Sequence, residues 1–145
     1  MPMPKPLTIP FARDALSQFI NEIPDTPQSG ADPQLASWSE GFGPITMQPL
    51  HSGGKPPEGQ DFNGILFAIS QHIVYQNGGG IYRFSQEYVD KTGGYDKDSV
   101  LIGADGSALW VSLSDNNAEN FNTANPVTQW VKISSVGLEQ QIQDV

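Results

Sequence analysis

The chain has 145 residues, which is enough for one domain with a hydrophobic core or for two very small ones. Its net charge of −9 disfavours contact with nucleic-acid phosphates and with anionic membrane surfaces. Because the chain has no cysteine, disulfides and thiolate metal sites are excluded. No apolar run reaches the roughly 18 residues of a membrane-spanning helix, so no membrane insertion is expected.

The first ten residues, MPMPKPLTIP, predict an extended, polyproline-like arm. Prolines stand where a secretory signal peptide needs an apolar helical run, so no such signal is expected. The arm is either a plain tail or a segment that docks onto another protein. The candidate docking residues are Pro2, Pro4, Pro6, Ile9 and Pro10.

Residues 11–60 predict an irregular segment, since the chain's 15 glycines and 12 prolines favour turns and extended stretches over a helical bundle. Residues 11–23 place apolar side chains at helical spacing, which indicates a short helix, with a loop as the alternative.

A central helix is predicted at about 61–77, within a segment 61–80, with Asp61 as its N-cap and Gly78 as its left-handed C-cap. Its main apolar stripe consists of Phe62, Ile65, Leu66, Ile69 and Ile73. A second apolar face holds Phe67 and Val74. A helix that is apolar on two faces is usually buried on both, so we expect one face to meet the chain's own core and the other a neighbouring subunit. Phe67 and Val74 are the candidate oligomer contacts.

Residues 81–133 predict a small antiparallel β-domain, which makes the fold class α+β. β-branched and aromatic runs indicate strands at 81–84, 99–103, 108–114 and 129–133, and ADGS at 104–107 is a hairpin turn signal. In the closing segment, 134–145, Leu138, Ile142 and Val145 have the spacing of a coiled-coil start, and a plain tail fits equally well.

No catalytic residue, cofactor or metal site is predicted, and the chain is not expected to be an enzyme. Gly78, Gly79 and Gly80 close a helix, whereas a phosphate-binding loop opens one. His51 and His72 belong to no zinc motif, and no nucleophile elbow is present. The acidic turns at 96–98 and 105 lack the spacing of a calcium-binding loop.

Three aromatic residues are candidates for stacking on a sugar or for a subunit interface: Tyr95, Trp110 and Trp130. A place in the core is the alternative, and we expect it for Trp110, which lies in the apolar run ALWVSL. Strand alternation puts Leu109, Val111 and Leu113 on the face opposite Trp110. The alternative is therefore that Trp110 points outward, toward a neighbouring subunit or a ligand.

Several segments resemble bacteriophage and prophage tail-fibre and tail-tip proteins: NEIPDT at 21–26, ASWSEGFGPITMQPL, GGKPPEGQDFNGILFAISQHIVYQNGGG, GGYDKDSVLIGADGSALWVSLSDNN and TQWVKI. The resemblance covers about residues 21–133. It departs at Asp96 and Asp98, where the family has GGYPKGAVL, and at GFGP, where the family favours GFPP.

This resemblance implies a virion protein, made in the host cytoplasm, that connects the host-recognition fibre to the tail or baseplate. It also implies a homo-oligomer, expected to be a trimer, and contacts with other tail or baseplate proteins.

Residues 95–131 are also similar to small carbohydrate-binding modules of chitinases, through Tyr95, Val100, Trp110, Asn116, Asn117, Pro126 and Trp130. This similarity implies the alternative function, direct contact with a host surface glycan.

Overall fold

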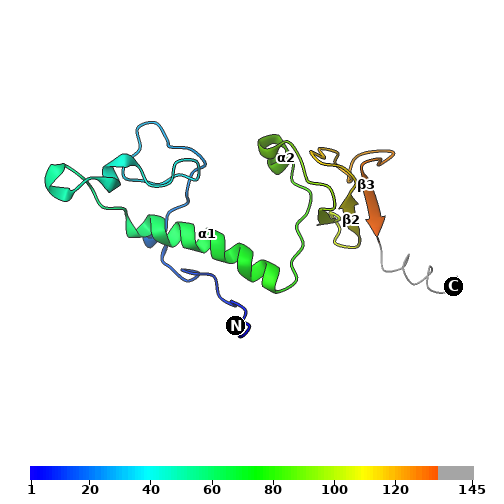
Figure 1. The fold of residues 1–145 in the computed structure, drawn as a ribbon, viewed down its shortest axis with the longest axis horizontal. Coiled ribbons are helices and arrows are strands. Elements are labelled where there is room, and N and C mark those ends of the chain that lie inside the picture. Colours follow the sequence, from blue (N-terminus) through cyan, green and yellow to red (C-terminus); the bar gives the residue numbers. More distant parts are fainter. Residues whose placement is uncertain (134–145) are drawn as a thin grey trace. The chain divides into compact units, whose positions relative to one another are not determined.

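A computed structural model describes residues 1–133, and the chain divides into two compact units, Met1–Gly79 (unit 1) and Gly80–Val145 (unit 2). The expected coiled-coil start, with Leu138, Ile142 and Val145, lies outside the described residues. Two α-helices and a three-stranded antiparallel sheet confirm the α+β class (Figure 1). Among the described residues, no helix is both long and apolar enough to cross a bilayer.

Unit 1 contains one long helix, α1 (Gly59–Asn77), and three short 3₁₀ turns at Ser17–Phe19, Pro44–Met47 and Leu50–Ser52. The remainder of unit 1 is irregular, as predicted. The helix expected at 11–23 is reduced to the single turn Ser17–Phe19. On either side of this turn, the backbone groups of Phe11, Phe19 and Asn21 bond to α1.

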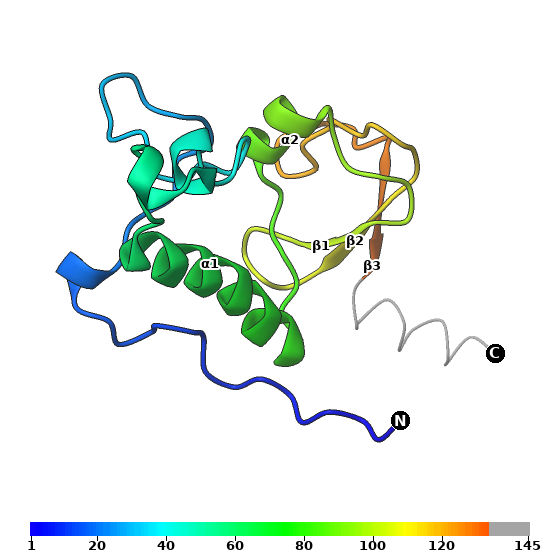
Figure 2. The same cartoon turned by 60° about the vertical axis from the view of Figure 1, so that its left-hand side comes forward.

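The N-terminal segment runs alongside α1, and we call residues 7–19 the strap (Figure 2). Three polar side chains of α1, seven residues apart, hold its backbone. Asn77 Nδ2 donates to the Leu7 carbonyl (3.0 Å), Ser70 Oγ accepts from the Phe11 N–H (2.8 Å), and Asn63 Nδ2 donates to the Phe19 carbonyl (2.8 Å). The predicted extended arm is therefore attached to its own helix from Leu7 onward.

Helix α1 begins two residues earlier than predicted, and Asp61 is not its N-cap. Glu58 occupies the cap position without a side-chain hydrogen bond. Asp61 is instead only 2% exposed. Its carboxylate accepts hydrogen bonds from Asn21 Nδ2 (2.9 Å) and from the backbone N–H of Ala36 (2.7 Å).

The helix exit also differs in one detail from the prediction. Gly78 has an ordinary φ of −80°, and Gly79, at +86°, supplies the left-handed residue. Only a glycine adopts this φ without strain, so the turn out of the helix depends on Gly79.

The apolar side chains of unit 1 lie mostly on its surface. Its buried hydrophobic residues, across the fully described range 1–79, are Ile23 and Ala36. On α1 the buried residues are Asp61, Gly64 and Ser70, while Phe67 and Val74 are half-buried. The main apolar stripe is largely exposed, so the face expected to meet the core of the chain faces outward.

Unit 2 is built on strands β1 (Val100–Ile102), β2 (Leu109–Ser112) and β3 (Trp130–Ile133), paired in that order. Leu101 pairs with Trp110, and Ser112 pairs with Trp130, so these residues share one face of the sheet. On this face lies the core cluster, Leu101, Phe121 and Trp130, against which Phe84, Tyr95, Trp110 and Val127 pack.

The turn between β1 and β2 forms where ADGS predicts it. The Gly103 N–H donates to the Ala108 carbonyl (2.7 Å), and Gly106 has a φ of +76°. The strand predicted at 81–84 is reduced to a single bridge between Arg83 and Ile102.

A second helix, α2 (Gln86–Thr92), has no counterpart in the sequence-based prediction. Ser85 caps its N-terminus by accepting a hydrogen bond from the Tyr88 N–H (3.2 Å). Gly93, with a φ of +92°, ends it.

Gly64 lets the segment around Asn21 pass close to α1. A Cβ at this position would overlap the Asn21 carbonyl oxygen and approach the Ile23 side chain, whereas the surroundings of Gly59 on the same helix are open. We expect Gly64→Ala to lower the free energy of unfolding by about 1–3 kcal/mol. Gly59→Ala should be neutral or slightly stabilising, because alanine favours helix. Urea denaturation followed by circular dichroism measures both, and equal effects of the two substitutions would contradict this close approach.

Candidate functional site

The described residues hold no cluster of three or more His, Asp or Glu side chains that could bind a metal ion. His51 lies in the 3₁₀ turn Leu50–Ser52 and His72 on α1, and both are exposed. Among residues 1–133, the candidate features are two apolar surfaces and two of the hollows. Each belongs to a single unit.

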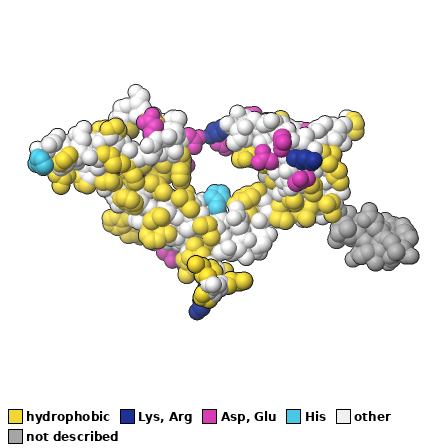
Figure 3. Space-filling view, in the orientation of Figure 1, with side chains coloured by type: hydrophobic (Ala, Val, Ile, Leu, Met, Phe, Trp, Pro, Cys, Tyr) yellow, Lys and Arg dark blue, Asp and Glu magenta, His cyan; other side chains and the backbone are white. Residues whose placement is uncertain are grey.

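One apolar surface of unit 1 consists of exposed side chains from α1 and from the strap. We call Phe62, Leu66, Ile69 and Ile73 the apolar stripe, and they are 46%, 42%, 48% and 43% exposed. The strap adds further exposed apolar side chains: Leu7, Ile9, Phe11, Leu16 and Phe19. Hydrophobic side chains cover much of the visible face over α1 and the N-terminal segment in Figure 3. Such a surface on a soluble protein usually marks a contact with another molecule.

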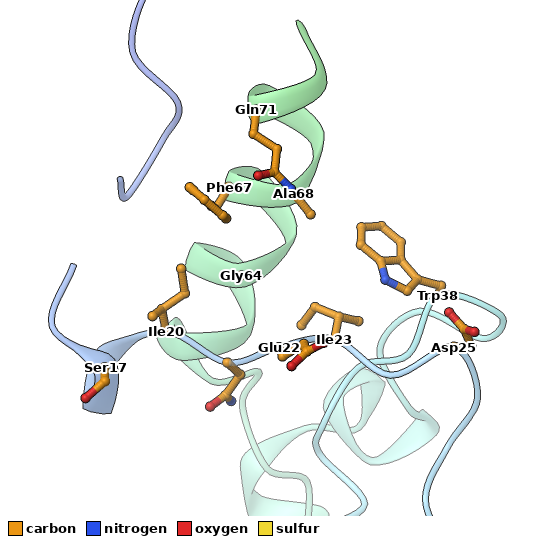
Figure 4. A pocket seen from close by; sticks show the side chains of 11 residues that line it. Ser17, Ile20, Glu22, Ile23, Asp25, Trp38, Gly64, Phe67, Ala68 and Gln71 are labelled. Carbon is orange, nitrogen blue, oxygen red and sulfur yellow. The ribbon is translucent and has the colours of Figure 1, made fainter. Parts of the chain in front are cut away.

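A hollow of about 610 Å³ opens on another side of α1 (Figure 4). Trp38 lies across it from Ile23 and Ala68, and Phe67 also lines it. Phe67, predicted as an oligomer contact, is a half-buried residue of this lining. Glu22 and Asp25 are also among the lining residues, which disfavours an anionic ligand.

In unit 2, the three candidate aromatic residues belong to one packed cluster, and they differ in how much of each side chain is exposed. Trp130 is only 3% exposed, and its indole N–H donates to the Glu119 carbonyl (2.8 Å). Tyr95 is half-buried, stacks on Tyr88 at a centroid distance of 4.7 Å, and its hydroxyl accepts from the Ser85 N–H. Desolvation raises the pKa of Tyr95. The predicted stacking role for Trp130 is therefore wrong, because its ring is buried in the core and has no face open to a sugar. The ring and hydroxyl of Tyr95 already contact Tyr88 and Ser85.

Trp110 packs against the core cluster, as expected, and also borders a shallow hollow of about 340 Å³. One face of its ring stacks on Phe121 at 4.8 Å and 14°, and Lys132 Nζ lies 5.8 Å from the ring centroid. A Cβ at Gly103 would lie 3.7 Å from the indole nitrogen, so the glycine keeps this polar edge open. Asp105 and Asn122 complete the polar lining.

Charge in this hollow is mixed. The hydroxyl and backbone N–H of Ser107 both donate to Asp105 Oδ1, at 2.7 and 3.0 Å. These hydrogen bonds, with a smaller contribution from nearby Lys132, lower the pKa of Asp105. The hollow therefore offers a carboxylate, an ammonium group and an aromatic ring edge, a combination that suits a neutral, hydroxyl-rich ligand.

The opposite face of the sheet is aliphatic. Strand alternation places on it Val100, Ile102, Leu109, Val111, Val131 and Ile133. Val100, Val131 and Ile133 are at least 38% exposed. This face is the second apolar surface.

Sequence reasoning missed two features of unit 1, the strap and the outward direction of the apolar stripe. A signal for the strap was present in the seven-residue spacing of Asn63, Ser70 and Asn77, which puts three hydrogen-bonding side chains on one line of a helix. No comparable signal marks which apolar face of a helix meets solvent.

Comparison with known protein families finds none that matches this chain, and comparison with curated proteins likewise finds no match.

The Glu119 side chain forms hydrogen bonds to the residues that directly precede β3. Its carboxylate accepts hydrogen bonds from the Thr128 N–H (2.8 Å), the Thr128 hydroxyl (2.9 Å) and the Gln129 N–H (3.2 Å). Desolvation alone would raise the pKa of Glu119, but these hydrogen bonds outweigh it and hold the pKa below its usual 4.5. A depressed carboxyl pKa stabilises the fold above the unfolded-state pKa, and this stabilisation is lost as the pH falls through the folded-state pKa.

We therefore expect unit 2 to lose stability as the pH falls below about 4.5, and Glu119→Gln to lose less over the same range. Urea denaturation between about pH 3 and about pH 6, followed by near-ultraviolet circular dichroism, measures the difference. Glu40→Gln, which removes an exposed carboxylate from unit 1, is the control and should retain the wild-type acid dependence. An identical acid dependence in Glu119→Gln and wild type would rule out this role for Glu119.

Proposed function

We propose that this protein is a structural component of a bacteriophage tail, in the tail fibre or tail tip. In this role it connects the host-recognition fibre to the tail or baseplate during attachment. The proposal places it in the virion, after synthesis in the host cytoplasm, as a homo-oligomer in contact with other tail proteins. The resemblance of five segments within residues 21–133 to tail-fibre and tail-tip proteins supports the phage assignment.

One structural observation supports the assembly role most directly. Unit 1 buries only Ile23 and Ala36 among its hydrophobic residues, while the strap and the apolar stripe expose theirs. Because so little apolar surface is buried within the unit, covering its exposed apolar side chains in an assembly would add considerably to its stability. The proposal assigns no catalytic step to the chain.

The start of the chain supplies a further contact for assembly. Residues 1–6 precede the first hydrogen bond of the strap, at Leu7, and they are exposed. A proline-rich extended segment loses little conformational entropy when a partner binds it. In the proposal, Pro2, Pro4 and Pro6 contact a neighbouring tail protein, and Leu7 onward belongs to unit 1.

Immunogold electron microscopy tests the phage assignment. Particles released from cells that carry the gene are labelled with antibodies against the chain. We expect label at one end of the tail, and none on particles from a strain that lacks the gene. Label confined to cell debris, with unlabelled tails, would overturn the assignment.

A second candidate function is contact with a host surface glycan, and the hollow beside Trp110 is the observation that favours it. The indole edge, a carboxylate, an amide and an ammonium group surround it, and these polar groups match the hydroxyls of a sugar. In this alternative, unit 2 binds the glycan directly.

Glycan-array binding distinguishes the two functions. If unit 2 binds a sugar, Asn122→Ala and Lys132→Ala should each weaken binding at least several-fold, because both side chains line the hollow. Lys97→Ala removes an equal charge elsewhere on the surface and should bind as wild type does. No binding of the wild-type chain to any glycan would remove the alternative.

A further inference from the structure

The strap contains one residue with a strained backbone. Ala12 has a φ of +60°, in the left-handed region. The other non-glycine residues of the described range 1–133 with a positive φ are Asp98 and Asn116, whose polar side chains make this region more accessible. Alanine has no side-chain group that forms a compensating hydrogen bond. Such strain persists only where surrounding contacts impose it, so the attachment of the strap to α1 holds Ala12 in this conformation.

Water can replace the hydrogen bonds that attach the strap. Asn63 is half-buried and Asn77 is exposed, so water reaches both amides when the strap leaves. Ser70 is only 9% exposed beneath the strap, but its hydroxyl also donates to the Phe67 carbonyl (3.3 Å) and keeps this bond without the strap. Release therefore leaves none of these three side chains buried without a partner, which is the main penalty for breaking buried hydrogen bonds.

The apolar side chains of the strap add little to its attachment. Their exposed fractions lie between 45% and 60% in Leu7, Ile9, Phe11, Leu16 and Phe19. Hydrophobic stabilisation is proportional to the apolar area that is removed from water, so about half of each side chain contributes nothing. The strap is therefore held mainly through its backbone.

The attachment becomes much firmer directly after the strap. Asn21 donates from its side chain to Asp61 (2.9 Å) and from its backbone N–H to the Gln60 carbonyl (3.0 Å). Ile23, two residues later, is only 8% exposed. Separating this segment from α1 would leave the buried Asp61 carboxylate without a partner, which is costly. Release therefore stops at Ile20, between the strap and this junction.

We propose that the strap detaches from α1 as one segment and re-forms, so that unit 1 has a closed and a released state. Release relieves the strain at Ala12, while α1 and the contacts of Asp61 stay in place. The free N-terminal segment then grows from residues 1–6 to residues 1–19. At about 3.3 Å for each extended residue, its reach increases from about 20 Å to about 60 Å.

In the proposed assembly role, the longer segment contacts a neighbouring tail protein before unit 1 does, and re-formation of the strap draws the two together. This consequence rests on the proposed function. The release itself does not, because it follows from the contacts within unit 1.

Limited trypsin digestion of the full-length chain measures the release, because unit 1 contains a single susceptible bond. Its basic residues are Lys5, Arg13 and Lys55, and a proline follows Lys5 and Lys55, which blocks cleavage there. Proteases act on the detached state of such a segment. We expect mass spectrometry to detect peptide 1–13 before the helical circular dichroism signal decreases. An Arg13 that stays uncut until urea unfolds unit 1 would overturn the proposal.

Two substitutions should change the rate of this cleavage in opposite directions. Ala12→Gly removes the strain, because glycine adopts a positive φ freely, and should slow cleavage several-fold. Ser70→Ala removes the acceptor of the Phe11 N–H and should accelerate cleavage several-fold. Ser29→Ala, in an exposed turn, is the control and should match the wild type. Synthetic peptides of residues 7–19 correct for the effect of each sequence on trypsin itself. Equal corrected rates in all four proteins contradict the proposal.

Asn77→Ala is a second accelerating variant, and it keeps the test decisive if Ser70→Ala does not fold. It removes the amide that donates to the Leu7 carbonyl, at an exposed position. Cleavage of Asn77→Ala at the wild-type rate would count against the proposal. Immunogold label on tails together with a protected Arg13 would overturn strap release alone. A strap that is cleaved as expected, in a chain absent from tails, would overturn the phage assignment alone.

Discussion

The carboxylate of Asp61 holds unit 1 together. It accepts hydrogen bonds from the Asn21 side chain and the Ala36 backbone, so it joins three segments that are far apart in the sequence. The Asn21 N–H also donates to the Gln60 carbonyl (3.0 Å), and Gly64 allows the same segment to lie against the next turn. A buried carboxylate is costly unless its partners are present, so these contacts form together or not at all.

This reliance on polar contacts explains where the apolar side chains of unit 1 lie. The buried residues of α1 are Asp61, Gly64 and Ser70. Asp61 and Ser70 accept hydrogen bonds from backbone N–H groups, and Gly64 lies against the Asn21 backbone, so these positions leave little space for large side chains. The strap, too, is attached through its backbone. Its apolar side chains and those of the apolar stripe are consequently left outside. Unit 2 differs, because Phe121, Trp130 and Leu101 form an aromatic core of its own.

Much of the fold follows from the sequence. The spacing of apolar residues located α1 to within two residues, and the ADGS turn placed β1 and β2. Helix α2 was not predicted, because seven residues are too few to show a helical spacing of apolar side chains. Its capping residue Ser85 and its terminating residue Gly93 are nevertheless typical of helix ends. Asp61 was assigned as an N-cap because aspartate before an apolar run is typical of one, and only tertiary contacts with Asn21 and Ala36 reveal its buried role.

The candidate surfaces were harder to predict than the elements. Periodicity separates the faces of a helix, but it does not say which face meets solvent. On α1, the face with more apolar residues is the exposed one. In β2, too, the sequence does not show which face of the strand meets the core. The aliphatic Leu109 and Val111 appeared to be the better core face, yet Trp110 packs on the core because Phe121 and Trp130 lie on its side of the sheet.

The central claim of this account is that unit 1 is completed by other copies of the chain. The dependence of its thermal stability on protein concentration tests this most directly, because association stabilises a fold by mass action. Melting of α1 is followed by far-ultraviolet circular dichroism over a hundredfold range of concentration. The account predicts a melting temperature that rises with concentration. A melting temperature that stays constant over the whole range, with a cooperative transition, would contradict it.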